Sequence, residues 1–181
     1  MSNYRRLHVS GGTWFFTVNL HDRHADLLTR HIAELRQAIR KVKQRHSFDI
    51  NAWVVLPDHM HCIWTLPAND CNYSQRWRAI KKAFTKSLPG NATVWQKRFW
   101  EHCIRDDRDY KAHIDYVYIN PVKHGLVKSV TEWPYSSFHR DVRNGLYPAD
   151  WAGGIDDFRT GERKEEGVKM VNDASNPNPP E

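Results

Sequence analysis

A short stretch near the middle of the chain, residues 53–64, places two histidines between two apolar runs. Pro57 and Asp58 are turn formers and separate the runs, so the stretch predicts two antiparallel strands joined by a tight turn. Side chains alternate along a strand, so His59 and His61 are expected on one face and the residue between them on the other. Two imidazoles on one rigid face can hold one metal ion. The stretch therefore predicts a sheet and marks a candidate metal site on it.

On its own, the histidine pair is a weak signal. The chain has 11 histidines, so such spacings arise by chance, and a structural role at the end of a half-exposed strand is the alternative. A zinc site that adds Cys62 and Cys71 is a further alternative. It is disfavoured because Cys62 alternates to the face opposite His61 and no Cys-x-x-Cys motif occurs.

The hydrophobic pattern around this stretch predicts an α+β fold. Residues 13–20 and 94–105 have the character of strands, whereas residues 27–45 and 74–88 have apolar side chains at helical spacing. A third helix is expected from an N-cap at Asp106 to about Asn120, before Pro121. This order predicts an antiparallel sheet with helices packed on one face, close to the ferredoxin-like plan.

Length and composition predict one domain with a tail. The chain has 181 residues, of which 40% are apolar, enough for one core over residues 1–154. Residues 155–181 are charged and end in Asn and Pro, so we expect them to be disordered. There is no run of about 18 apolar residues and no signal-peptide pattern, so a soluble, cytoplasmic protein is expected. Three unpatterned cysteines indicate reduced thiols.

Basic side chains gather in two places within a chain of net charge +6. Arg5 and Arg6 lie in a short N-terminal arm, for which the alternative is a frayed terminus. The second predicted helix has five basic residues and no acidic partner: Arg76, Arg78, Lys81, Lys82 and Lys86. Its outward line, Arg78, Lys82 and Lys86, repels itself, and a solvated face usually mixes charges. Together with the 12% aromatic content, this favours a polyanion with stackable faces, namely nucleic acid.

The third predicted helix carries a tyrosine and an asparagine four residues apart. Tyr116 and Asn120 therefore share one face, and His113 lies about one turn before Tyr116 on the same side. Tyr118 falls off that face and belongs with the apolar stripe. From this helix alone, a core tyrosine with a satisfied hydroxyl is the favoured interpretation of Tyr116.

In combination and order, these features resemble the REP-associated tyrosine transposases, bacterial relatives of the single-tyrosine HUH transposases. The resemblance covers about residues 3–160. The segments that carry it are Tyr4-Arg5-Arg6, Gly11-Gly12-Thr13-Trp14-Phe15, residues 53–61, Arg98-Phe99-Trp100-Glu101-His102, Tyr116, residues 118–126 and Trp133-Pro134-Tyr135-Ser136-Ser137. The resemblance implies an enzyme that cleaves and rejoins single-stranded repetitive extragenic palindromes (REPs), which fold into hairpins beside a short tetranucleotide.

The resemblance also implies a role for each candidate residue. His59 and His61 would hold Mg²⁺ or Mn²⁺, and Asn120 stands where better-known relatives place a glutamine as third ligand. Asparagine is one methylene shorter, so its contact with the metal is direct, through water or absent. Tyr116 would attack the scissile phosphate and leave a 5′-phosphotyrosine with a free 3′-hydroxyl. Its proton would pass to a metal-bound group or to a neighbour such as His113.

Two other classes of function fit parts of the pattern. One is a nucleic-acid-binding module without catalysis, whose sheet aromatics stack on bases, although no RNP-type strand is present. The other is a metal hydrolase that uses activated water without a covalent step. The expected partner is a single-stranded DNA hairpin, and the resemblance implies a monomer rather than a dimer.

Overall fold

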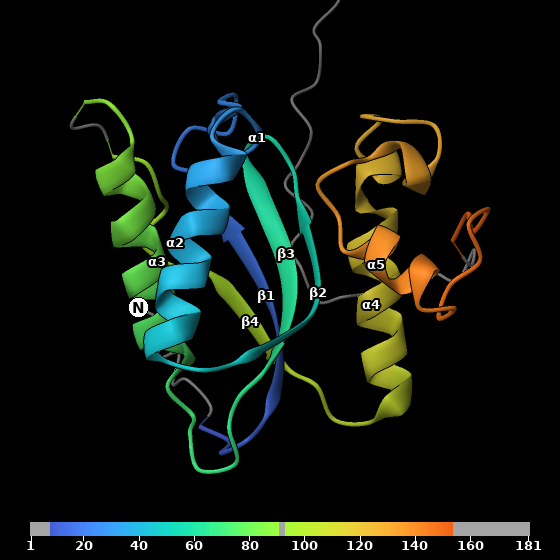
Figure 1. The fold of residues 1–181 in the computed structure, drawn as a ribbon, viewed down its shortest axis with the longest axis horizontal. Coiled ribbons are helices and arrows are strands. Elements are labelled where there is room, and N and C mark those ends of the chain that lie inside the picture. Colours follow the sequence, from blue (N-terminus) through green and yellow to red (C-terminus); the bar gives the residue numbers. More distant parts are fainter. Residues whose placement is uncertain (1–7, 91–92, 154–181) are drawn as a thin grey trace, which may run out of the picture.

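At the centre of the molecule is a four-stranded antiparallel sheet in the order β2-β3-β1-β4. The structure is a computed structural model, and it describes residues 8–90 and 93–153. The strands are β1 (Thr13–Asn19), β2 (Asp49–Val55), β3 (His59–Thr65) and β4 (Trp100–Cys103). Helices connect β1 to β2 and β3 to β4, so the predicted ferredoxin-like α+β plan is confirmed (Figure 1).

The histidine stretch forms the predicted strand, turn and strand. Leu56 N–H donates to the carbonyl of His59 at 2.8 Å and closes the turn between β2 and β3. Two other segments hold the turn by hydrogen bonds: Leu28 N–H donates to the Pro57 carbonyl at 3.1 Å, and Leu20 N–H donates to the Asp58 carbonyl at 2.8 Å. The start of β3 is therefore fixed from both sides.

One face of the sheet is covered by α1 (Leu27–Arg30), α2 (Ile32–Arg45) and α3 (Tyr73–Ser87). The sequence predicts one helix over residues 27–45. In the structure this helix is interrupted at His31, whose backbone angles are φ −111° and ψ 40°. The break lets α1 dock on the β2–β3 turn through Leu28, while α2 follows the sheet. Trp64 and Trp77 stack in this core with ring centroids 4.2 Å apart.

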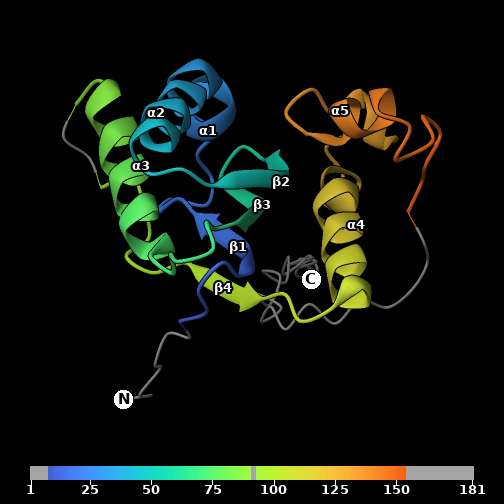
Figure 2. The same cartoon turned by 60° about the horizontal axis from the view of Figure 1, so that its bottom comes forward.

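The third helix, α4 (Asp107–Lys123), covers the opposite face together with α5 (Phe138–Arg143) (Figure 2). The prediction that the helices lie on one face is therefore wrong for α4. The physical reason is visible in β1, where Phe15 and Phe16 are both fully buried but belong to different cores. A strand that is apolar on both faces needs a layer on each.

The ends of α4 differ in how well the sequence predicts them. Asp106 is the N-cap, as predicted, and its side chain accepts from Asp109 N–H at 2.8 Å. The helix does not stop before Pro121 but continues to Lys123. Pro121 removes one helical hydrogen bond and its ring crowds the carbonyl of Val117, a cost that the burial of Val117 and Tyr118 against the sheet offsets. Gly125, with φ 67°, then ends the helix.

The fourth predicted strand, residues 94–105, is mostly irregular. Only Trp100–Cys103 pairs with β1 as β4, and Trp95 makes a single bridge to Leu20 after which the chain bends. At the other edge, residues beyond α4 cover β2, since Val55 N–H donates to the Tyr135 carbonyl and Ser137 N–H to the Trp53 carbonyl, each at 2.9 Å. An edge closed in this way offers no template to another strand.

Three further sequence predictions concern the chain as a whole. All three cysteines are free thiols, as expected. Within the ranges 8–90 and 93–153, no helix has the length and apolar character needed to cross a membrane. The arm that carries Arg5 and Arg6 and the tail over residues 155–181 lie outside the described residues, so the proposed division after residue 154 stays a prediction.

Candidate active site

The two histidines of β3 lie side by side on the face that α4 covers. His59 is 4% exposed and His61 is 1% exposed, and their ring centroids are 5.0 Å apart at a steep angle. The intervening Met60 packs on the other face, as the strand period predicts. Cys62 also belongs to that opposite core and is buried, which rules it out as a ligand beside His61. Burial raises the pKa of the Cys62 thiol well above its usual range.

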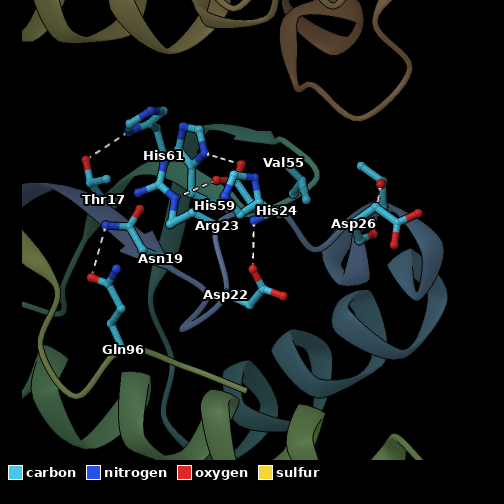
Figure 3. Close-up of polar contacts among 12 residues, drawn as sticks. Thr17, Asn19, Asp22, Arg23, His24, Asp26, Val55, His59, His61 and Gln96 are labelled. Atoms are coloured by element: carbon cyan, nitrogen blue, oxygen red, sulfur yellow. Dashed lines mark hydrogen bonds and ion pairs between the residues drawn. The ribbon is translucent and has the colours of Figure 1, made fainter. Parts of the chain in front are cut away.

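Each imidazole is held through its Nδ1 atom (Figure 3). Thr17 Oγ1 lies 2.8 Å from His61 Nδ1, and Asp58 Oδ1 lies 2.7 Å from His59 Nδ1. Arg23 Nε donates to Asp58 Oδ2 at 2.5 Å and fixes the carboxylate in turn. An Nδ1 atom held by a hydroxyl or a carboxylate orients the ring and directs its Nε2 lone pair to a ligand.

The electrostatics of the pair favour metal binding over protonation. Burial, followed by the neighbouring imidazoles of His59 and His124, lowers the pKa of His61 well below its usual value. Burial alone would raise the pKa of Asp58, but hydrogen bonds and charges from His59 and Arg23 outweigh it and lower that pKa to about 2. At neutral pH the site therefore offers a neutral imidazole at His61 and an ionised carboxylate behind His59.

Helix α4 brings Tyr116 and Asn120 to the histidines. The Tyr116 ring is half-buried, with its centroid 5.2 Å from that of His61. Asn120 is 1% exposed, and its side chain is close enough to His61 to oppose the fall in pKa. Its Oδ1 atom is buried and makes no well-formed hydrogen bond with any described residue. A buried amide oxygen in this state is costly unless a ligand satisfies it, so the residues fit a divalent cation that accepts nitrogen and oxygen donors.

Tyr118 points away from this site, as its position on the helix predicts. It is fully buried, and its hydroxyl donates to the Asp141 carboxylate and lies 3.2 Å from Ser137 Oγ. Burial and the Asp141 carboxylate raise the pKa of the Tyr118 hydroxyl above its usual value. The hydroxyl is therefore part of a structural network between α4 and α5.

A second cluster of metal-ligand residue types lies at His102, Asp109 and His113, with the donor atoms within 4.8 Å of one another. Hydrogen bonds already engage its carboxylate, since His102 Nε2 lies 2.8 Å and Arg105 Nε 3.1 Å from Asp109 Oδ2. Burial would raise the pKa of Asp109, but these partners lower it to about 2. The cation of Arg105 beside the carboxylate makes this cluster a poorer metal site than the β3 pair.

The predicted DNA contacts on α3 do not converge on these histidines. Arg78, Lys82 and Lys86 are exposed on α3, on the side of the sheet opposite α4. Arg76, which the sequence groups with them, is 2% exposed and donates to the Asp70 carboxylate and the Ser47 carbonyl, both at 2.7 Å. Arg76 is therefore engaged inside the protein, whereas Arg78, Lys82 and Lys86 stay predicted phosphate contacts.

Sequence reasoning missed four residues around the site. Thr17, Asp58 and Arg23 support the imidazoles, and Lys123 places its Nζ 4.9 Å from the centroid of the Tyr116 ring. Asp58 stands directly before His59 and could have been noticed. Thr17 has no signal in the sequence, because only the pairing of β1 with β3 brings it opposite His61.

A cavity lies away from this site. It encloses about 650 Å³ between α4, α5 and the edge of β2, with Tyr110, Arg140 and Trp151 among its lining residues. It shares no lining residue with the histidine pair or with Tyr116. A cavity of this size therefore does not by itself mark the functional centre.

Comparison with known proteins places this arrangement in a family. No protein-family model matches the chain. A REP-associated tyrosine transposase from Escherichia coli K12 is 62% identical over 163 residues, which are 90% of this chain and 98% of the relative. The chain belongs to the REP-associated tyrosine transposases.

Two further comparisons agree with this family. A Haemophilus influenzae protein described in the same family terms is 47% identical over 169 residues, covering 86% of this chain and 96% of the relative. A solved structure of a REP-associated tyrosine transposase bound to a REP hairpin matches with a TM-score of 0.85 at 62% identity, covering 90% of this chain and 98% of that one. The chain is thus an enzyme of the tyrosine transposase class, with the four-stranded fold of the REP-associated transposases.

Proposed function

We propose that this transposase is a metal-dependent endonuclease and strand transferase that acts on single-stranded REP hairpins with an adjacent tetranucleotide. One observation supports the proposal most strongly: the Tyr116 ring lies against His61 of the buried pair His59 and His61. The buried Oδ1 atom of Asn120, which has no hydrogen-bond partner among the described residues, belongs to the same site. The relative bound to a REP hairpin supports the substrate class. We expect a monomer in the cytoplasm.

In this proposal, His59, His61 and Asn120 would hold Mg²⁺ or Mn²⁺, with two imidazole nitrogens and one amide oxygen as donors. The bound ion would polarise a phosphoryl oxygen and stabilise the extra charge of the transition state. Thr17 and Asp58 keep the two rings from rotating, so the ligand geometry is set before DNA arrives.

Tyr116 is the nucleophile. Its phenolic oxygen bonds to phosphorus, the bond to the 3′ oxygen breaks, and the products are a 5′-phosphotyrosine and a free 3′-hydroxyl. The phenol proton needs an acceptor, and His113 on the same helix is one candidate. Burial lowers the pKa of His113, so its imidazole is neutral, and it could hold the phenol proton until the departing 3′ oxygen takes it up. Reversal of the step by a 3′-hydroxyl rejoins the strand.

A covalent-trapping experiment tests the proposal. A labelled REP hairpin with a single-stranded flank should form an adduct with the protein that survives denaturing electrophoresis, and the adduct should require Mg²⁺ or Mn²⁺. Tyr116→Phe removes only the reacting hydroxyl, so adduct and cleavage should fall at least about 10³-fold, the scale on which nucleophile removal acts. Tyr118→Phe is the matched control and should keep both, since its hydroxyl serves α5.

Three results would contradict parts of this scheme. Cleavage at the normal rate by Tyr116→Phe would assign the attack to water or another residue. Cleavage by the wild type without an adduct would favour the hydrolase alternative. Binding without any cleavage would favour the non-catalytic module.

A further inference from the structure

The sheet face that carries the histidines continues to β4, the edge strand of the described sheet. Backbone pairing aligns His61 with Thr17, and Thr17 in turn with Trp100, so the three side chains form one row across β3, β1 and β4. Adjacent strands are about 4.8 Å apart, which places Trp100 about 10 Å from His61 across the sheet. The row leads from the candidate metal site to an aromatic ring at the edge.

Trp100 is part of an ordered stack of rings. It lies parallel to His102, with centroids 6.0 Å apart and planes 7° apart, and His102 lies parallel to His113, with centroids 4.6 Å apart. Asp109 fixes His102 by the hydrogen bond to its Nε2 atom. Phe15 contacts both Trp100 and Tyr116, with ring centroids 5.6 Å and 5.9 Å apart. The tryptophan plane is therefore held in a fixed orientation relative to Tyr116.

The surroundings of Trp100 are suited to a polyanion. Its ring is half-buried on an edge strand, and Arg98 and Arg105, on either side of it in the chain, are exposed. Phe99 packs against Phe16 in the opposite core, and Arg98, which precedes it, is exposed just before β4 begins. An aromatic face between exposed cations is the arrangement with which proteins bind single-stranded nucleic acid, through base stacking and phosphate contacts.

We propose that Trp100 is a stacking platform for an unpaired nucleobase next to the scissile phosphate, with Arg98 contacting the adjoining phosphate. The inference rests on the proposed function, because it takes the DNA strand to cross this sheet face. Stacking here would fix the flank over the row from Trp100 to His61 and so bring one phosphate to Tyr116. Residues of β4 would thus bind the single-stranded flank, independently of any contact between the protein and the hairpin stem.

The test uses the full chain and REP hairpins with and without a single-stranded flank. Binding is measured with 2-aminopurine at each flank position, in the Tyr116→Phe background so that no turnover occurs. One position should show fluorescence quenching on binding, and Trp100→Leu should abolish this quenching and weaken flanked-hairpin binding about tenfold, as expected for one stacked base. Trp100→Phe should restore most of both effects, and binding of the hairpin without a flank should not change.

Trp53→Leu is the matched control. Trp53 is also a half-buried tryptophan on an edge strand, but it packs on the α2 side of the sheet, near Arg36. It should leave the quenching and the affinity unchanged. If Trp100→Leu behaves like Trp53→Leu, or weakens both hairpins equally, the stacking proposal is overturned while the proposed function stands. If the chain with Tyr116 intact forms no adduct on any flanked hairpin, the proposed function fails and the platform falls with it.

Discussion

The two faces of the sheet are built from the same four strands but differ in what they bury. The face under α2 and α3 is an aromatic core, in which Trp14, Trp64 and Trp77 are each about 1% exposed. The face under α4 also has an apolar core, but it buries the polar side chains of His61, His113 and Asn120 as well. Burying polar groups costs stability unless they are satisfied. One face is therefore almost entirely apolar, while the other buries costly polar groups, which are the ones that we propose for catalysis.

The largest test of this contrast concerns the histidines. His59→Ala or His61→Ala should reduce cleavage at least about 10³-fold, because transition-state stabilisation by a metal is lost. Hairpin binding should remain, since the ion acts on the scissile phosphate rather than on the stem. Gel-shift and cleavage assays measure the two effects, with circular dichroism as the control for folding. A variant that fails to fold would return the pair to a structural role and erase the contrast between the faces.

A substitution in the other face should have the opposite profile. Trp77→Ala removes a fully buried ring that stacks on Trp64, and large-to-small changes of this kind cost about 3–5 kcal/mol. We expect that decrease in the free energy of unfolding, measured by urea denaturation. Cleavage per folded molecule should stay near that of the wild type. A large drop of turnover in the folded fraction would show that the two faces are coupled.

Removing a side chain that orients an imidazole should have an effect of intermediate size. Thr17→Val keeps the shape of the side chain but removes the hydroxyl that lies against His61 Nδ1. Removing such a partner lowers metal affinity about 10–100-fold, which titration with Mn²⁺ should detect. Thr13→Val is a suitable control, because Thr13 lies on the same strand but bonds Thr65 instead. Equal affinities in both variants would mean that Thr17 does not orient the site.

The smallest expected effect belongs to the basic line on α3. If Lys82 and Lys86 bind phosphates, replacing both with alanine should flatten the dependence of log affinity on log salt by about 0.7 for each phosphate that is no longer neutralised on single-stranded DNA. These residues lie on the α3 side of the sheet, so an effect would extend the DNA path around the molecule. An unchanged slope would mean that the line is a solvated face and that DNA stays on the α4 side.

Local rules were sufficient wherever one element decides the outcome. The β2–β3 hairpin, the shared side of His59 and His61, and the separation of Tyr118 from the face of Tyr116 and Asn120 all follow from the periods of strands and helices. They failed where the answer depends on another element. His31 breaks a helix because α1 docks on a distant turn, and Arg76 is buried because Asp70 and Ser47 surround it.

The sequence by itself determined which side chains share a face on each element, because backbone geometry fixes that direction within a few residues. It also marked the family. Only the tertiary structure decided which faces meet: that α4 lies across the histidine face, that Thr17 stands opposite His61, and that Trp100 continues the same row. These contacts form because apolar surface is buried on both faces of one sheet. That stabilisation comes from segments far apart in the chain, so it cannot be inferred from any one segment alone.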